Sequence, residues 1–461
     1  MALLAAYAVP HPPLIVPEVG RGQERRVQRT IDAYHKIAEE IGALAPETIL
    51  VLTPHSVLYS DYIHISPGKG AAGDLGRFGA GQVSLSVDYD TPLVSLIEEL
   101  NFEAGIPAGT QGERDPSLDH GILVPLYFLR ERLPGCRIVR ISVSGLTPLE
   151  HYRFGICIQK SIEKLGRRAV LIASGDLSHR LKEEGPYDFA EEGPQFDRQI
   201  TQAMARGDFL QFLQFEEGFC EAAGECGLRS FQVMAGALDG LAVQSELLSY
   251  EGPFGVGYAV SAYRVTGLDP KRRFDLQYQA EQKIKLEQAK DGEDDYVKLA
   301  RLSLETFLLE RKNLKRPQDL PGELLDQKAG VFVSLKKHGR LRGCIGTIAP
   351  VEENVADEII RNAVSAGVGD PRFDPVAPEE LPELTYSVDV LGKPEPIAGM
   401  DQLDVKRYGV IVTRGRKRGL LLPNLDGVTS PAQQVQIALQ KAGISPEEQY
   451  AMERFEVVRH L

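Results

Sequence analysis

Four histidines lie just past apolar runs in the first half of the sequence, and their placement suggests a shared site. They are His11 in AYAVPHPP, His55 in ILVLTPHS, His120 in SLDHGILVPL and His179 in LIASGDLSH. In an open α/β sheet the carboxyl ends of the strands border the ligand crevice, so side chains placed there converge although they are far apart in sequence. Neutral imidazole is the commonest transition-metal ligand. The four histidines therefore predict a mononuclear metal centre.

His11 and His55 are the best candidates for a pair of metal ligands. Each follows an expected strand, and each lies beside a proline that stiffens the loop presenting the ring. Either histidine alone is better explained as a capped or solvent-facing loop residue, but the shared placement favours ligand roles for the pair. Two imidazoles and one anionic group leave positions on iron(II) where a substrate and dioxygen can bind.

The anionic third ligand is expected in CEAAGECGLR, residues 220–229. Cys226 is the first choice and Glu225 is the reserve. A helix is predicted at residues 230–241, and a helix amino terminus lowers the pKa of a nearby thiol, which favours the thiolate that a metal needs. The alternative reading of the cysteine is a small buried hydrophobic residue.

Asp176 and His179 are three residues apart in SGDLSH, at the end of an expected strand. The Asp176 carboxylate is expected to orient the His179 ring and to set its tautomer, so that His179 acts as a general acid or base. Alternatively, Ser174 or Asp176 only caps the next turn. His120 precedes an apolar helix, where it can donate to a substrate oxygen or to dioxygen, or serve only a structural role.

The elements that position these residues alternate between strands and helices, which predicts an α/β domain with a mostly parallel sheet covered by helices on both faces. A helix is expected around residues 27–41, where apolar residues recur at helical spacing. The other expected helices are residues 92–100, 120–133, 148–165 and 196–206, and the expected strands are residues 3–9, 48–53, 83–87, 137–143, 169–173 and 255–265.

The character of the chain changes after Gly267, which predicts two domains. Residues 1–267 are expected to form the first domain, and residues 268–290 are crowded with charged and amide side chains typical of a linker, which we expect to be partly helical. Residues 291–461 are expected to form a smaller α+β domain, with hairpins at residues 330–348 and 410–422. In LRGCIGT, the residues Arg342, Gly343, Cys344 and Gly346 form a second candidate site, because glycines allow a ligand close to the backbone. The alternative is tight strand packing around a buried thiol.

Composition limits the partners. The 461 residues include 65 acidic and 52 basic side chains, so the net charge of −13 repels phosphate backbones and disfavours nucleic acid as a partner. No stretch approaches the ~20 apolar residues of a membrane span, and the start of the chain lacks the basic segment of a secretory signal. We therefore expect a cytoplasmic protein that binds a small molecule or another protein. The sequence leaves homo-oligomer formation open.

Six motifs together carry a family resemblance over residues 1–267. PHPP, TPHS, RFGA, LDHGILVPL, SGDLSH and AGECGLRSFQVMAGAL resemble, in this order, the class III extradiol dioxygenase catalytic subunit superfamily, including its Memo-like branch. The resemblance implies that His11, His55 and Cys226 bind a metal, with Fe(II) favoured over another divalent metal or copper. It also implies that His179, with His120 nearby, acts in proton transfer. Ring-cleaving members typically have Glu or His as the third ligand, whereas Memo-like members resemble this chain in having Cys.

Residues 291–461 resemble a different family. GVFVSLKKHGRLRGCIGT, DPRFDPV and YGVIVTRGRKRGLLLP are similar to the AMMECR-type domain, whose function is not established. The fusion resembles an arrangement associated with a radical S-adenosylmethionine partner. Because this chain has no CxxxCxxC motif, the iron–sulfur cluster would belong to that partner. Two hypotheses follow. One is an extradiol-type oxidoreductase acting on an aromatic substrate; the other is a metal-binding accessory or scaffold protein for the radical partner, without ring cleavage.

Overall fold

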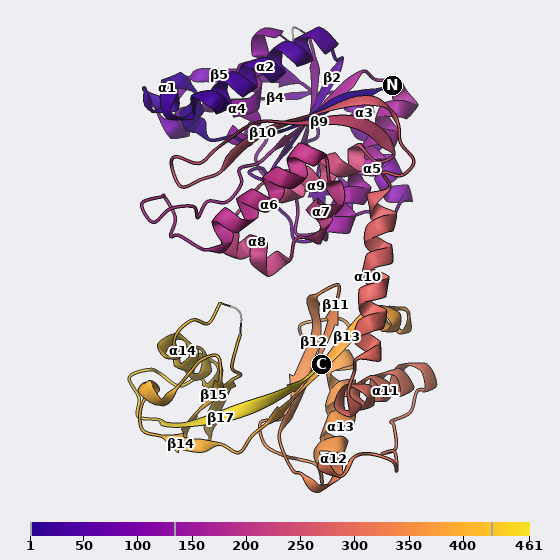
Figure 1. The fold of residues 1–461 in the computed structure, drawn as a ribbon, viewed down its shortest axis with the longest axis vertical. Coiled ribbons are helices and arrows are strands. Elements are labelled where there is room, and N and C mark those ends of the chain that lie inside the picture. The colour runs from indigo at the N-terminus through magenta and orange to yellow at the C-terminus, as the bar shows by residue number, and fades with distance from the viewer. Residues whose placement is uncertain (1, 133–134, 426) are drawn as a thin grey trace. The chain divides into compact units, whose positions relative to one another are not determined.

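The computed structural model describes residues 2–132, 135–425 and 427–461. The chain folds into two compact units, Met1–Gln279 and Ala280–Leu461, and each has hydrophobic clusters of its own. Figure 1 shows the elements of both units. Within the described ranges, no helix is long and apolar enough to span a membrane.

The first unit is built on a mixed six-stranded sheet. The first four strands in the sheet order are parallel, and the last two run antiparallel to their neighbours. The predicted α/β class is confirmed, whereas a mostly parallel sheet is not. In sheet order the strands are β7 (Arg137–Ser142), β2 (Thr48–Thr53), β8 (Ala169–Ser174), β1 (Leu3–Val9), β10 (Tyr258–Leu268) and β9 (Leu241–Glu251).

The sheet is buried on both faces, and the sequence of its central strands explains why. Every residue of β2 and β8 is buried, as expected for continuous apolar runs covered on both sides. Alternate residues of β1 enter different clusters: Ala6 and Ala8 pack on one face, and Ala5, Tyr7 and Val9 on the other. Helices cover both faces (Figure 1). The helices are α1 (Pro17–Gly20), α2 (Gln28–Leu44), α3 (Thr91–Glu103), α4 (His120–Leu129), α5 (Pro148–Leu165), α6 (Glu192–Arg206), α7 (Phe209–Gln214), α8 (Glu217–Ala223) and α9 (Leu228–Ala237).

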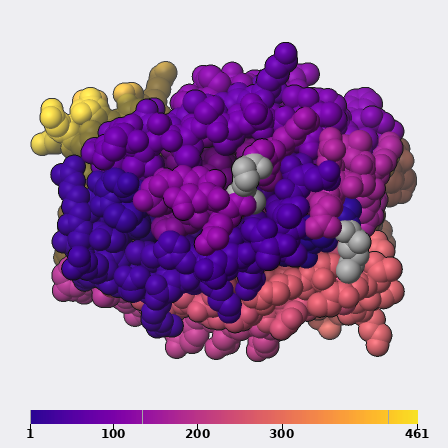
Figure 2. Space-filling view, turned by 90° about the horizontal axis from the view of Figure 1, so that it is seen from above, coloured from indigo at the N-terminus to yellow at the C-terminus, as the bar shows by residue number. Residues whose placement is uncertain are grey.

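The first unit also contains four short strands outside the main sheet. The beginning and the end of its chain segment lie side by side. On the face shown in Figure 2, the indigo segments near the start of the chain lie beside the salmon segments that close this unit. The pairing of β1 with β10 and the contact of α2 with β9 require this arrangement. The small strands are β3 (Ile63–His64), β4 (Gly70–Leu75), β5 (Ala80–Asp88) and β6 (Ala108–Gly109).

Several predicted boundaries differ from the structure. The helix expected at residues 230–241 is α9 (Leu228–Ala237), which ends early because Leu241 begins β9, a strand that the sequence analysis missed. The helix expected at residues 120–133 ends at Leu129 and continues as a 3-10 turn to Arg132; its predicted last residue, Leu133, lies outside the described residues. The helix expected within the linker segment is α10, which spans Phe274–Asp291 and ends one residue beyond that segment.

The second unit contains a seven-stranded antiparallel sheet, in agreement with the predicted α+β class. Both predicted hairpins are present, as the β11–β12 and β15–β16 pairs. The strands are β11 (Val331–Lys337), β12 (Arg340–Gly346), β13 (Leu384–Leu391), β14 (Glu395–Ile397), β15 (Tyr408–Arg414), β16 (Lys417–Leu421) and β17 (Ala451–His460). The helices of this unit are α11 (Asp295–Glu310), α12 (Gly322–Asp326), α13 (Val355–Val368) and α14 (Pro431–Ala442).

Candidate metal centre

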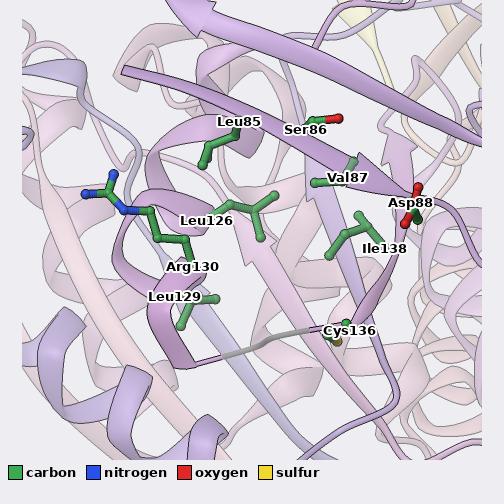
Figure 3. A pocket seen from close by; sticks show the side chains of 10 residues that line it. Leu85, Ser86, Val87, Asp88, Leu126, Leu129, Arg130, Cys136 and Ile138 are labelled. Atoms are coloured by element: carbon green, nitrogen blue, oxygen red, sulfur yellow. The ribbon is translucent and has the colours of Figure 1, made fainter. Parts of the chain in front are cut away.

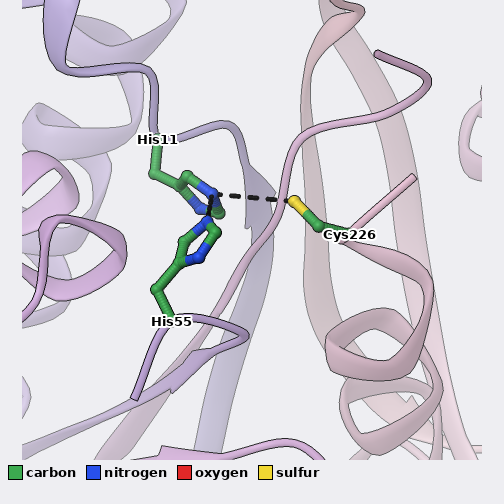
Figure 4. Close-up of side chains that lie close together, drawn as sticks. All are labelled: His11, His55 and Cys226. Carbon is green, nitrogen blue, oxygen red and sulfur yellow. Dashed lines mark hydrogen bonds between the residues drawn. The ribbon is translucent and has the colours of Figure 1, made fainter. Parts of the chain in front are cut away.

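Three potential ligands converge at one edge of the sheet of the first unit (Figure 4). His11 follows β1, His55 follows β2, and Cys226 lies in the loop between α8 and α9. Their ligand atoms lie within 4.8 Å of one another. The Nε2 atoms of His11 and His55 are 2.9 Å apart, and Cys226 Sγ is 3.7 Å from His11 Nε2. The histidines meet because β1 and β2 both pair in parallel with β8, which brings their carboxyl ends together.

The His11 ring is held from behind by the end of β8. Its Nδ1 lies 2.9 Å from the Ser174 hydroxyl, so Nε2 is left facing His55. The backbone N–H of His11 also donates to the Asp176 carboxylate at 2.8 Å. His11 is only 1% exposed. A ring ordered through its second nitrogen in this way is a common feature of metal-ligating histidines.

The environment keeps both histidines neutral. Burial holds the pKa of His11 well below its ordinary value, and the neighbouring imidazoles of His55, His120 and His179 add to the effect. Burial, followed by the charge of His120, lowers the pKa of His55 to about 4. Neutral imidazole is the form that binds a metal, so neither ring has to lose a proton near neutral pH.

The protonation state of Cys226 corrects a prediction from the sequence. A helix amino terminus was expected to lower its pKa, but the pKa is raised well above the ordinary value, first by burial and then by the carboxylates of Asp176 and Glu225. The α9 helix begins only at Leu228, and desolvation outweighs its partial charge. Cys226 is therefore a thiol until a cation compensates the thiolate, and metal binding would release its proton.

These residues fit a transition metal. Two neutral imidazole nitrogens and one sulfur form a mixed donor set that suits iron, copper or zinc better than magnesium or calcium. Glu225, the reserve ligand, lies outside the converging set: its carboxylate accepts from the Leu228 N–H at 2.7 Å, at the start of α9. Burial raises its pKa to about 7.

Asp176 and His179 do not form the predicted pair. The Asp176 carboxylate binds the His11 backbone, while His179 Nδ1 lies 2.6 Å from the carbonyl oxygen of Gly224. Since a carbonyl only accepts, His179 Nδ1 carries the proton and Nε2 is left unprotonated. Burial lowers the pKa of His179, so the ring is neutral and can accept a proton. A backbone carbonyl thus holds His179 where a carboxylate was expected.

His120 lies against the converging ligands without being one of them. Its ring stacks on His55 with centroids 4.1 Å apart, and it meets the His11 ring edge-on at 5.3 Å. Phe78 packs against its other side at 5.3 Å. Burial lowers the pKa of His120. The fold therefore brings the first three of the four histidines into direct ring contact.

A buried arginine, which the sequence analysis missed, ties two of the site loops together. Arg140 on β7 is 2% exposed; its Nη2 donates to the Ser56 hydroxyl at 2.7 Å and lies 3.5 Å from Asp119 Oδ2. Ser56 directly follows His55, and Asp119 directly precedes His120. The signal in the sequence was a charged residue inside the apolar run RIVRISV.

Asp119 extends this connection to the backbone of His55. Its carboxylate accepts from the Thr53 hydroxyl at 2.7 Å and from the Gly121 N–H at 2.9 Å, which caps α4 at His120. The Thr53 oxygen in turn accepts from the His55 N–H at 3.1 Å. His55 and His120 are thus positioned by one connected set of hydrogen bonds.

Close backbone contact at Gly175 yields a first prediction. A Cβ at Gly175 would lie 2.1 Å from the Cα of Gly227, so Gly175→Ala must push the loop that carries Cys226 away from the histidines. We expect metal affinity to fall roughly 10–100-fold, as when a supporting residue is lost. Chelator competition measures this affinity. Gly218→Ala, where a Cβ meets nothing within 4 Å, is the control; equal affinities in the two variants would contradict the expectation.

The pocket in Figure 3 lies elsewhere in the first unit, between β5, α4 and the start of β7. Its lining includes Leu126, Arg130 and Cys136 but none of the four histidines. Burial raises the pKa of the Cys136 thiol to about 11, so this cysteine is protonated near neutral pH. The pocket is not part of the candidate metal centre.

In the second unit, two members of the second candidate site, Gly343 and Gly346, lie in close packing contacts, and a third, Arg342, forms an ion pair. A Cβ at Gly343 would lie 2.1 Å from the Ala366 carbonyl oxygen, and one at Gly346 would overlap the ring of Phe332. Arg342 is engaged through Nε and Nη2 with the Glu380 carboxylate, at 3.0 and 2.9 Å. The glycines therefore allow β12 to pack closely. Cys344 remains partly exposed.

Comparison with known proteins identifies two families in the chain. Residues 5–261 match the family described as the catalytic LigB subunit of aromatic ring-opening dioxygenase, and residues 297–460 match AMMECR1. A Clostridium acetobutylicum protein, CA_C1420, is 43% identical over all of this chain and 99% of its own length. A Thermotoga maritima protein is 44% identical over 37% of this chain and 98% of its own length. The crystal structure of uncharacterized protein PH0010 from Pyrococcus horikoshii is 34% identical, covering 36% of this chain and 89% of that one, with a TM-score of 0.34.

Proposed function

Because this chain belongs to the family of catalytic LigB subunits of aromatic ring-opening dioxygenases and carries a second, AMMECR1 domain, we propose that its first unit is a mononuclear non-haem iron oxidoreductase of the extradiol type. The observation that carries the proposal is the convergence of His11, His55 and Cys226. Its substrate is a small aromatic diol or a related molecule. Iron(II) is the proposed metal, with another divalent metal or copper as alternatives.

In this proposal the residues around the three ligands have different roles. Iron(II) held by them would supply open coordination positions for the substrate and dioxygen. His179 accepts a hydroxyl proton at Nε2, because its Nδ1 proton is engaged with the Gly224 carbonyl. His120, stacked on His55, donates a hydrogen bond to a substrate oxygen. Asp176 is a positioning residue, since it holds the His11 backbone rather than a reacting group.

The cysteine favours a second candidate function. A thiol among the ligands is open to oxidation by the dioxygen that ring cleavage consumes. The alternative is a metal-binding accessory or scaffold protein that works with a radical S-adenosylmethionine partner and cleaves no ring. In that function the four histidines hold and shield the metal, and the AMMECR1 domain serves the same partner.

Anaerobic reconstitution with iron(II), followed by a panel of catechols and measurement of oxygen uptake, tests the proposal. We expect oxygen uptake that is matched by formation of a ring-opened product and is strongly reduced in His179→Ala. The matched control is His338→Ala, because His338 lies half-exposed in the second unit, on the turn between β11 and β12. If the protein binds iron tightly but consumes no oxygen with any catechol, the oxidoreductase proposal is wrong and the accessory function is favoured.

A further inference from the structure

One face of the sheet in the second unit carries a thiol beside hydroxyl groups. Cys344 on β12 pairs with Ser334 on β11, which pairs with Ser387 on β13. The Ser334 hydroxyl donates to Cys344 Sγ at 3.2 Å. The alternate residues of β11, such as Val333, are buried in the cluster that includes residues of α11 and α13. The face with Cys344 is therefore the one turned away from this core.

An arginine is fixed beside Cys344 by a buried carboxylate. The Arg372 guanidinium donates to Asp370 through Nε at 2.9 Å and Nη2 at 2.7 Å, and the Asp370 side chain is only 2% exposed. Asp370 also accepts from the Cys344 N–H at 2.9 Å. Arg372 Nη2 donates in addition to the Cys344 carbonyl at 3.2 Å. This carboxylate therefore binds both the cysteine backbone and the arginine.

A second arginine is held in the same way. Arg459 on β17 donates to Asp389 on β13 through Nε at 2.7 Å and Nη2 at 2.9 Å, and the Asp389 side chain is 2% exposed. Across the sheet, Arg459 pairs with Asp389, and Asp389 pairs with Phe332 on β11. Phe332 is two residues before Ser334, the partner of Cys344, so Arg459 and Cys344 lie on the same face of the sheet, in neighbouring rows of paired residues. Among the described residues, Nη1 of Arg459 has no hydrogen-bond partner.

Both guanidinium groups remain accessible on the side of the sheet that carries Cys344. The pKa of Arg372 is raised first by its hydrogen bonds with Asp370 and further by Cys344; that of Arg459 is raised first by Asp389 and further by Cys344. The side chains of Arg372 and Arg459 are 55% and 43% exposed. Two arginines from distant parts of the chain thus lie on the face of Cys344, each oriented by its own buried carboxylate, and Arg372 also bonds the Cys344 backbone.

We propose that Cys344, Ser334, Arg372 and Arg459 form a binding site for the carboxylate or phosphate group of a small molecule, which is presented to the thiol. A guanidinium matches the geometry of both anions, and one that is already oriented loses less side-chain entropy when it binds. This site lies within the second unit and is independent of the metal centre.

Alkylation of Cys344 in the full-length protein tests the site with two probes that differ mainly in charge. With iodoacetate or iodoacetamide, the sulfur attacks the methylene carbon, the carbon–iodine bond breaks, iodide leaves, and the thiol proton passes to solvent. Peptide mass spectrometry gives the rate at Cys344 for each reagent. We expect the iodoacetate-to-iodoacetamide rate ratio to exceed that of free glutathione by roughly 10-fold, since oriented guanidinium groups bind a carboxylate and not a neutral amide. A ratio equal to that of glutathione would overturn the proposal.

Variants separate recognition of the anion from general charge. Arg459→Gln should bring the rate ratio towards that of glutathione. If this variant unfolds because Asp389 is left unpaired, the double variant Asp389→Asn with Arg459→Gln replaces the ion pair with a neutral pair and should show the same change. The control is Arg407→Gln, which removes a charge from an exposed pair with Glu456 in the same unit. If Arg407→Gln lowers the rate ratio as much as Arg459→Gln does, specific recognition of the anion is refuted.

Competition identifies which anion the site prefers. Inorganic phosphate and acetate, each at the same ionic strength, are added during alkylation by the uncharged iodoacetamide. Slower reaction of Cys344 with phosphate alone supports a phosphate group as the ligand, and slower reaction with acetate alone supports a carboxylate. If neither anion slows the alkylation of Cys344 and the rate ratio equals that of glutathione, the two arginines form only structural ion pairs and the proposed site is rejected.

Discussion

Purified His55→Ala protein is expected to bind its metal roughly 100-fold more weakly than the wild type or worse, because loss of a direct ligand should exceed the 10–100-fold cost of losing an outer support. His55 supplies one of three converging donor atoms, and its Nε2 lies 2.9 Å from that of His11. Its lowered pKa means that the ring is already in the metal-binding form. Elemental analysis of metal per chain measures the loss.

His179→Ala should behave in the opposite way. His179 is absent from the converging set and is held by the Gly224 carbonyl, so the metal content should stay near that of the wild type. If His179 moves a substrate proton, turnover should fall roughly 10²–10⁴-fold. An empty His179→Ala protein beside a loaded His55→Ala protein would invert these roles, and the site would then have to be rebuilt around His179.

Arg140→Met is expected to destabilise the first unit by about 3–5 kcal/mol, because it removes the charge partner of a partly buried carboxylate and leaves polar groups without a donor. Arg140 donates to Ser56 and to the Pro116 carbonyl and lies 3.5 Å from Asp119. Denaturant unfolding of the full-length protein, followed by tyrosine fluorescence, measures the loss. Metal affinity should fall as well, since the loops that carry His55 and His120 lose their common anchor.

Arg167→Met is the matched control for this effect. Arg167 pairs with the fully buried Asp90 at 3.1 Å, and among the described residues the hydrogen bonds and ion pairs of this pair involve no residue of the metal centre. Its removal should destabilise the first unit while metal affinity stays unchanged. If both variants weaken metal binding to the same degree, Arg140 contributes only to the stability of the fold.

Much of the site could be placed from local pattern. The apolar runs at residues 3–9 and 48–53 are strands, and the residues that follow them, His11 and His55, lie together at one edge of the sheet. This was predictable because a continuous apolar run marks a strand buried on both faces, and the carboxyl ends of parallel strands meet. The two hairpins of the second unit were equally visible, since alternation and a polar turn are properties of a short segment.

Hydrogen-bond partners were beyond the reach of the sequence. Asp176 was expected to hold His179, three residues away, but it binds the backbone of His11, which is 165 positions distant. The antiparallel pairings of β10 with β1 and with β9 were missed for the same reason, and these pairings make the sheet mixed. A hydrogen bond depends on which groups the fold places within reach, and sequence separation says little about that.

Electrostatic environment was decided only by the tertiary structure. A helix amino terminus is visible in the sequence and favours a thiolate at Cys226, but burial and two carboxylates raise its pKa instead. In the second unit the sequence pointed to Arg342 beside Cys344, but Arg342 is engaged with Glu380, and the arginine that bonds the Cys344 backbone is Arg372. The sequence by itself determined which residue types stand at the ends of strands. Desolvation and charge proximity are sums over all neighbours in space, so only the folded chain determined what those residues can do.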